Sequence, residues 1–212
     1  TVHGNVTYNV PGEYGSAIHF DGNGTYIEVD SNEALNVSNI SISLWVNISN
    51  LPTSPDFTNG AEALVCRNVD SPGWLTTSWC LDLEYSPWTT PNNGFRFHTG
   101  HGENGGGHQS VKTTSMISEG EWIHVAVTCD ESETKIYFNG QMEDSAQAWT
   151  CPVESSNAPV YIGGKANSTG FISPTWINGT MDEIRIYDNE FNSSEVEYLY
   201  NLTRLVEDDD DD

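Results

Sequence analysis

Basic residues are scarce in this sequence. Its 212 residues include 7 lysines and arginines against 31 aspartates and glutamates, which gives a formal net charge of -24. A surface with this charge repels nucleic-acid phosphates and anionic membranes, so we expect neither as a partner. Repulsion within the chain is relieved when salt shortens the screening length. The composition therefore fits either a halophilic protein or an ordinary acidic secreted one.

Long apolar runs are also missing. No stretch of 18 or more apolar residues is present, and the first residues lack the basic and apolar regions of a signal peptide. We therefore expect no membrane span. A chain of this length suits one all-β domain, which we place at residues 1–205. The remaining acidic run, residues 206–212, is expected to be a solvated tail or linker.

Cysteine is rare, but the number is even. Four cysteines without paired Cys-x-x-Cys spacing are more typical of disulfides than of a zinc site, and they allow three connectivities. We favour sequential pairing, Cys66 with Cys80 and Cys129 with Cys151. Each bridge would close a short loop, worth roughly 3 kcal/mol in the chain-entropy model.

Acceptor triplets for N-linked glycans are abundant. Nine Asn-x-Ser/Thr triplets indicate surface loops of a glycoprotein that is extracellular or lies at the cell surface. Their asparagines are Asn5, Asn23, Asn36, Asn39, Asn47, Asn167, Asn178, Asn192 and Asn201. No triplet falls between residues 48 and 166, so that region is left open for contacts.

Apolar residues alternate with polar ones along most of the chain. In "ISISLWVNI", residues 40–48, the isoleucines, leucine and valine share one face, which predicts a half-buried strand. Similar short runs recur, separated by glycine, asparagine, proline and serine. The pattern predicts an all-β, two-sheet antiparallel jelly-roll sandwich.

Two local signals refine this picture. Asn139-Gly140 is a strong signal for a two-residue hairpin turn after the strand at residues 134–138. Near the end, "NSSEVEYLYNL" offers Asn192 or Ser193 as a helix N-cap and apolar residues at helical spacing. We therefore expect one short C-terminal helix.

These segments together resemble a known family. "GEYGSAIHFDGNGTYIEV", "ISISLWVNI", "EWIHVAVTCDESETKIYFNGQ", "VYIGG" and "GTMDEIRIYD" occur in the order found in laminin-G-like jelly-roll domains of the concanavalin A-like lectin and glucanase superfamily. The resemblance covers essentially the whole chain. It implies an extracellular recognition module that binds glycans or proteins and often holds a structural calcium ion.

The same resemblance suggests where calcium would bind. It implies that the loop after "FDG" lies near the start of the last long strand, so Asp21 and Asp182 could share one Ca²⁺ with carbonyl oxygens of Gly22 and Gly24. Hard oxygen ligands suit this ion. Alternatively, Asp21 caps a turn, and Asp182 and Glu183 face water at the start of a strand.

Aromatic and histidine side chains supply candidate ligand contacts. Loop aromatics can stack on sugar rings, although long loops also bury their own tryptophans. A glycine-rich stretch, residues 97–108, adds histidines that could instead bind zinc with Glu103, or simply face solvent. The residues we predict to contact a ligand are Trp74, Trp79, Tyr85, Trp88, His98, His101 and His108.

Catalytic patterns are absent. The chain has neither the Glu-x-Asp-x-x-Glu spacing of related glucanases nor a Gly-x-Ser-x-Gly nucleophile turn. Asp82 and Glu84 share one strand face, but an ordinary strand explains them better. We therefore expect no enzyme activity.

Two functions remain from these observations. The first is an extracellular, non-catalytic recognition module that binds a glycan or a cell-surface glycoprotein in adhesion. The second is a structural, glycosylated building block of a surface layer, filament or virion, assembled with other chains. Members of the resembled family usually begin with an extra strand, which here is cut away, replaced by the first residues, or supplied by another chain.

Overall fold

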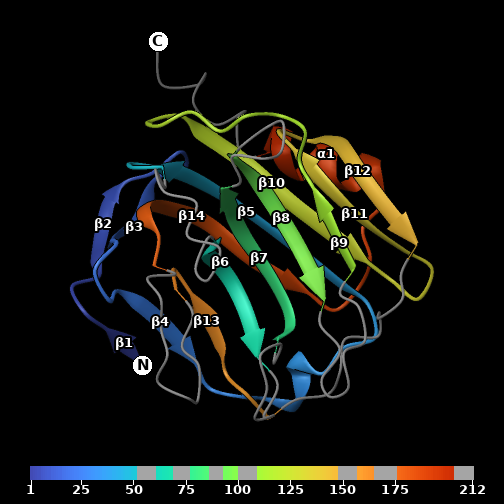
Figure 1. Cartoon of the computed structure of the whole chain (residues 1–212), viewed down its shortest axis with the longest axis horizontal. Helices are drawn as coiled ribbons and strands as arrows, with labels where there is room; N and C mark the ends of the chain where they lie inside the picture. Colours follow the sequence, from blue (N-terminus) through green and yellow to red (C-terminus); the bar gives the residue numbers. More distant parts are fainter. Residues whose placement is uncertain are drawn as a thin grey trace.

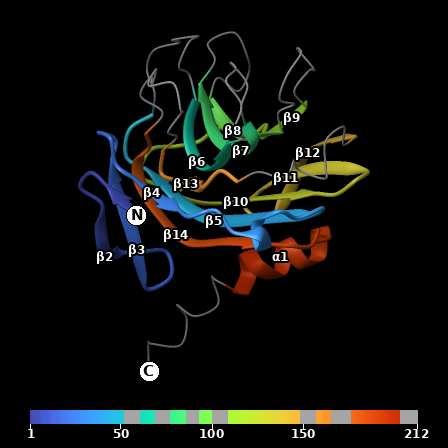
Figure 2. The same cartoon turned by 90° about the horizontal axis from the view of Figure 1, so that it is seen from below.

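The protein is a sandwich of two antiparallel sheets, seven strands in each. The computed structural model describes residues 1–51, 61–68, 77–85, 93–99, 109–147, 157–164 and 176–202. Figures 1 and 2 show the two layers face to face, with the single helix of the described residues outside one of them. The predicted jelly-roll sandwich with a short C-terminal helix is confirmed.

One layer, the front sheet, faces the viewer in Figure 1. In order across the sheet, its strands are β1 (Val2–His3), β4 (Tyr26–Val29), β13 (Val160–Ile162), β6 (Ala61–Asn68), β7 (Thr77–Tyr85), β8 (Asn93–Thr99) and β9 (Gln109–Lys112). Neighbours in space are distant in sequence, because β13 lies between β4 and β6.

The other layer, the back sheet, lies behind it. In order, its strands are β12 (Gln141–Gln147), β11 (Glu133–Phe138), β10 (Trp122–Cys129), β5 (Ile40–Ile48), β14 (Asn178–Tyr187), β3 (Ser16–Asp21) and β2 (Thr7–Pro11). A short 3-10 helix, Glu33–Leu35, precedes β5. The first eleven residues thus supply an edge strand to each sheet, β1 in front and β2 behind.

The core fills the space between the sheets with alternate residues of each strand, as the period of two requires. From β5, the residues Ile40, Ile42, Leu44, Val46 and Ile48 are buried. The front sheet contributes Leu64, Val65, Trp79, Leu81, Leu83, Phe95 and Phe97. The opposite face of β5 is also buried at Ser41, Ser43 and Trp45. The prediction of a half-buried β5 was therefore wrong.

Helix α1 (Ser193–Leu202) lies on the far side of the back sheet (Figure 2). The Asn192 side chain accepts hydrogen bonds from the N–H groups of Ser194 and Glu195, at 2.9 and 3.1 Å. The Glu195 carboxylate in turn accepts from the Asn192 N–H at 2.8 Å, which completes a capping box. Val196 is buried against Tyr137 of β11. The predicted N-cap is confirmed, and none of the helices described is long and apolar enough to cross a membrane.

The predicted hairpin is also confirmed. Asn139 and Gly140 have φ angles of 49° and 78°, and Phe138 pairs with Gln141. Positive φ at both central residues is the geometry that matches strand twist in a two-residue turn.

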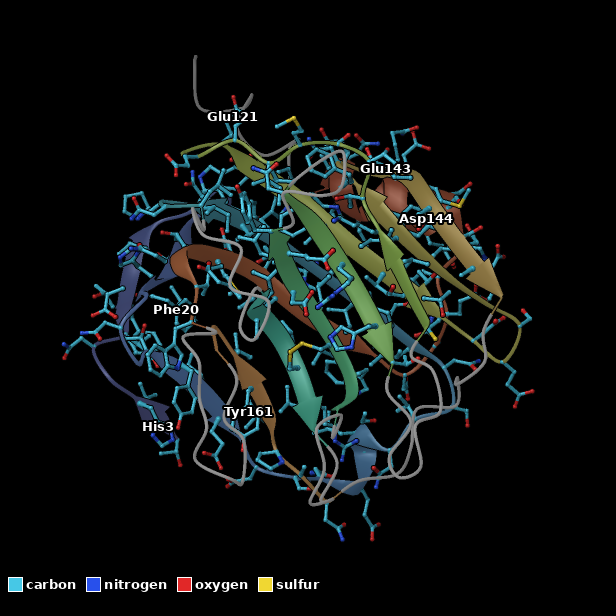
Figure 3. All side chains as sticks on the ribbon, viewed as in Figure 1. His3, Phe20, Glu121, Glu143, Asp144 and Tyr161 are labelled. Carbon is cyan, nitrogen blue, oxygen red and sulfur yellow. A yellow bond between two sulfur atoms is a disulfide. The ribbon has the colours of Figure 1, made fainter. Side chains whose placement is uncertain are left out.

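Carboxylates of β12 cover the free edge of the front sheet. Asp144 accepts a hydrogen bond from the Lys112 N–H at 3.0 Å, and Glu143 accepts from those of Thr114 and Ser115 at 2.7 and 2.9 Å. Glu143 and Asp144 are labelled beside β9 in Figure 3. Satisfied N–H groups make this edge a poor template for strand pairing.

Candidate functional site

The outward face of the front sheet collects polar and aromatic side chains. Because Leu81 and Leu83 of β7 point into the core, the alternate residues of that strand, Cys80, Asp82 and Glu84, point away from it. Strand pairing continues this face over six strands as one row, formed by Glu28, Tyr161, Cys66, Cys80, His98 and Ser110. We call the outward-pointing residues of the front sheet the outward face.

A charged network occupies one half of the outward face. Arg96 donates two hydrogen bonds to Asp82, from Nε at 3.0 Å and Nη2 at 2.8 Å, and one to Glu84 from Nη1 at 2.8 Å. His98 Nε2 lies 3.1 Å from Asp82 Oδ2, and Lys112 Nζ lies 2.8 Å from Glu84 Oε2. Asp82 is buried, while the other four side chains keep 13 to 26% of their surface exposed.

The network fixes the charge of its central carboxylate. Burial acts to raise the pKa of Asp82, but the charges of Arg96 and His98 and their hydrogen bonds outweigh it and hold that pKa well below its usual range. Burial likewise acts to lower the pKa of Arg96, but Asp82 and Glu84 raise it overall. An aspartate held ionised in this way is a poor general acid, so Asp82 does not suit the role of the acid in glycoside hydrolysis.

Aromatic rings occupy the other half. The rings of His3 and Tyr26 stack with centroids 4.2 Å apart, and Tyr161 meets Tyr26 edge-on at 6.0 Å. His3 Nε2 lies 3.2 Å from Glu28 Oε2. All four side chains, those of His3, Tyr26, Glu28 and Tyr161, are half-buried. Burial, and secondarily the charge of Glu28, raises the pKa of Tyr26. Figure 3 labels His3 and Tyr161 on this side of the sheet.

Sequence reasoning missed this aromatic half because it searched loops for ligand contacts. The alternation in "TYIEV" and "VYIG" could have placed Tyr26 and Tyr161 on one face of each strand. It could not have shown that β4 and β13 pair, since they lie more than 130 residues apart in the sequence.

The predicted ligand residues have different outcomes. The prediction that Trp79 contacts a ligand is corrected: its side chain is fully buried in the core, because it shares the inner face of β7 with Leu81 and Leu83. His98 joins the charged network, and Tyr85 is half-buried at the end of β7. The remaining predicted contacts lie outside the described residues: Trp74, Trp88, His101 and His108.

The predicted calcium ligands do not come together. Asp21 pairs with Asn178, four residues before Asp182 on β14, which is about 13 Å of extended chain. Asp21 instead closes a turn by accepting hydrogen bonds from the Asn23 N–H and the Thr25 hydroxyl, at 2.9 and 3.0 Å. Gly22 and Gly24 lie in that turn with positive φ, away from Asp182. The prediction of a calcium site shared by Asp21 and Asp182 was therefore wrong. Calcium binding by itself stays a prediction.

Metal binding at the charged network is also disfavoured. Within the described ranges, Cys80, Asp82 and His98 form the one group of three donors close enough for an ion. Cys80, however, is bonded to Cys66, so its sulfur is not a thiolate. The Arg96 guanidinium already neutralises Asp82. The zinc alternative with His101, Glu103 and His108 falls outside the described residues.

The disulfide predictions are partly resolved. The Cys66–Cys80 bridge is confirmed and joins directly opposed residues of β6 and β7, with Cα atoms 4.1 Å apart. Cys129 is also disulfide-bonded. Its predicted partner, Cys151, lies outside the described residues.

The glycan acceptors lie away from the outward face. Among the described residues, none of the acceptor asparagines is on a front-sheet strand. Asn5, Asn23, Asn36, Asn192 and Asn201 are exposed, Asn39, Asn47 and Asn178 are half-buried, and Asn167 is outside the described ranges. A glycan at a described acceptor would therefore not be attached to a strand of the front sheet itself.

A buried serine and histidine form a second polar pair, on the other side of the molecule. Ser43 Oγ and His124 Nε2 lie 2.9 Å apart on the back sheet, and both side chains are buried. The other ring nitrogen, Nδ1, has no hydrogen-bond partner. Without a group to orient the imidazole, and with no access to solvent, this pair does not form a nucleophilic site.

Comparison with known proteins adds family information. A family model described as the concanavalin A-like lectin/glucanases superfamily matches residues 21–197. The chain is 24% identical over 187 residues to Paraclostridial mosquitocidal protein 1 of Paraclostridium bifermentans. That match covers 82% of this chain and 13% of the relative, so the chain spans a small part of the relative's length.

Solved structures share the fold at low sequence identity. Domain 4 of AbnA, an extracellular arabinanase of Geobacillus stearothermophilus bound to arabinotriose, aligns with a TM-score of 0.69 and 22% identity, covering 93% of this chain and 82% of that one. The binding domain of Paraclostridial mosquitocidal protein 1 gives 0.70 and 22%, covering 95% and 47%. The binding domain of botulinum neurotoxin DC, in complex with rat synaptotagmin II, gives 0.68 and 18%, covering 96% and 46%.

Proposed function

We propose that this chain, which belongs to the concanavalin A-like lectin/glucanases superfamily, is a non-catalytic module that binds a glycan or glycoprotein through the outward face of its front sheet. We place this activity outside the cell, in recognition or adhesion at a surface. The observation that carries the proposal is the outward face itself, where half-exposed rings and hydrogen-bonding charges share one continuous row of paired strands.

The chemistry of this face suits a sugar ligand. Tyrosine rings offer apolar faces to sugar rings, while carboxylates, guanidinium and imidazole can bond hydroxyl groups. Arg96, Lys112 and His98 are each paired with a carboxylate, so they leave little net positive charge for an anionic ligand. Arabinotriose bound to one structural neighbour, and rat synaptotagmin II bound to another, support both a glycan and a protein as ligands.

Binding is tested by calorimetry on a panel of neutral oligosaccharides that includes arabinotriose. Tyr161→Ala should weaken binding of any hit about tenfold, since loss of one ring contact is worth about 1.4 kcal/mol. Tyr198→Ala, which removes a tyrosine with 63% exposure on α1, is the matched control and should leave affinity unchanged. Equal affinity in both variants would place the ligand elsewhere.

The non-catalytic part has its own test. Prolonged incubation with an oligosaccharide that binds should release no new reducing ends. Turnover that disappears in Glu84→Gln would instead identify the charged network as an active site.

A further inference from the structure

The second half of β14 has a neighbouring strand on only one side. β3 pairs with β14 from Asn178 to Met181, where the pairing ends at Ile18. β5 continues to pair on the other side as far as Tyr187. In the part of the chain that the structure describes, no strand covers Ile184–Tyr187 on the side away from β5. Figure 2 shows β14 continuing toward α1 past the β2 and β3 hairpin.

A β-bulge separates the two halves of β14. Asp182 pairs with Trp45 and Arg185 with Ser43, so Glu183 and Ile184 lie opposite a single residue. Glu183 has a φ of 50°, a left-handed conformation that bulky residues rarely adopt. Bulges redirect strands and are frequent at the ends of pairing and beside functional sites. Of the two carboxylates that open "DEIRIY", Asp182 therefore pairs just before the bulge and Glu183 lies in it.

The bulge also anchors the turn between β2 and β3. Asp182 is 5% exposed, and its carboxylate accepts hydrogen bonds from the N–H groups of Tyr14 and Glu183, each at 2.8 Å. Gly12 lies against this carboxylate, because a Cβ there would collide with Asp182 Oδ2. These contacts hold β3 where its pairing with β14 stops.

A cavity of about 330 Å³ opens at that point. It is lined by residues 16–18 of β3 and residues 181–185 of β14. Beyond it, Ile184 and Ile186 pack against the core but remain half-buried. Alternate backbone N–H and C=O groups of a strand point to each side, so those on the side away from β5 face this opening.

We propose that the edge at Ile184–Tyr187 is a docking site for an extended segment of a partner protein, in which apolar residues alternate with basic ones. The apolar residues would cover Ile184 and Ile186, and the backbone would pair with β14. The charges in this part of β14 and just after it are net acidic: Arg185 forms an ion pair with Glu183, which leaves the carboxylates of Asp182 and Asp188, and Asp188 is exposed. A second copy of this chain, itself carrying a charge of -24, would be repelled.

The test uses a blocked pentapeptide in which lysine alternates with valine, titrated into the full chain and followed by backbone amide NMR. Shifts should be confined to residues 16–18 and 183–188, and exchange should slow at least tenfold at those Ile184–Tyr187 amides that point away from β5. The same peptide with alternate amides N-methylated keeps its charge but loses backbone hydrogen-bond donors. It should therefore bind at least tenfold more weakly. Glu183→Gln should weaken binding severalfold, whereas Glu197→Gln on α1 should not.

Three results would overturn this proposal. Equal binding of the N-methylated peptide would mean attraction by charge without strand pairing. Slow exchange, in the chain without peptide, of those Ile184–Tyr187 amides that point away from β5 would mean that the edge is already covered. Self-association of the chain with protection of the same amides would mean that a second copy, and not a basic partner, occupies it. None of these results bears on glycan binding at the outward face, which lies on the other sheet.

Discussion

The imidazole of His124 should make the protein sensitive to acid. It is buried beneath α1, with ring centroids 5.3 Å from Trp45 and 5.7 Å from Tyr200. Burial, and then the charge of Arg185, lowers its pKa from 6.5 to about 4. The nearby hydroxyl of Ser43 bonds one ring nitrogen, but the other has no partner. Protonation would place a positive charge where no group compensates it.

The sign and size of the effect follow from linkage. Because the folded pKa lies below the unfolded one, the unfolded chain binds more protons between about pH 4 and 6.5. The contribution of His124 to the free energy of unfolding therefore falls as the pH drops through this window. From pH 8 to pH 5 the loss due to His124 is about 2 kcal/mol, and below pH 4 it reaches about 3 kcal/mol.

Glu62 opposes this trend in the same pH range. Burial raises its pKa from 4.5 to about 7, so the folded chain binds more protons there and gains stability as the pH falls. The two effects nearly cancel in the parent protein, so its pH profile alone reveals neither. A difference between the parent and a variant at His124 is required.

The assay is urea unfolding of the parent and of His124→Gln at pH 8 and pH 5. The free energy of unfolding should fall between these pH values by about 2 kcal/mol more in the parent than in the variant. This comparison is insensitive to any constant loss caused by the substitution. A difference below about 0.5 kcal/mol would refute the assignment of a buried, neutral imidazole.

Three further substitutions test the packing and the charged network. Glu62→Gln should stabilise the protein by up to about 3 kcal/mol at pH 8 and by little near pH 4.5, as measured by urea unfolding. Gly140→Ala should lower the melting temperature more than Gly120→Ala does. Both glycines have φ near 80°, but only a Cβ at Gly140 would meet a side chain, the Tyr200 ring at 2.9 Å, so equal losses would contradict that contact. Arg96→Met should cost about 3 kcal/mol, because it removes the bidentate guanidinium from the buried Asp82 carboxylate and leaves it the contact with His98. Arg185→Met, at a half-exposed pair, should cost less than about 1 kcal/mol, and similar losses would mean that the network is solvated.

Local sequence signals predicted the elements well. The alternation in residues 40–48 identified β5, Asn139-Gly140 identified the hairpin of β11 and β12, and Asn192 identified the start of α1. Each of these features is determined by residues a few positions apart, so a short stretch of sequence is enough to predict it. Even the burial of Trp79 could have been predicted, because it alternates with Leu81 and Leu83.

Features that depend on distant pairing were not predictable. The bulge at Asp182 is held by the Tyr14 N–H, 168 residues away in the sequence. The aromatic half of the outward face requires Tyr161 to lie beside Glu28. A calcium site that combined Asp21 with Asp182 failed for the same reason, because it needed a register that the alternation of either strand alone does not define.

The central claim, ligand binding at the outward face, is tested most directly by NMR with arabinotriose and with every neutral oligosaccharide that binds in the calorimetric panel. Backbone and tyrosine ring signals should be followed during titration, once in calcium and once in chelator. The account predicts shifts at Tyr26 and Tyr161 and at the strands that carry Arg96 and His98, with none on α1. Saturable binding whose shifts fall only on the back sheet and α1 would contradict it.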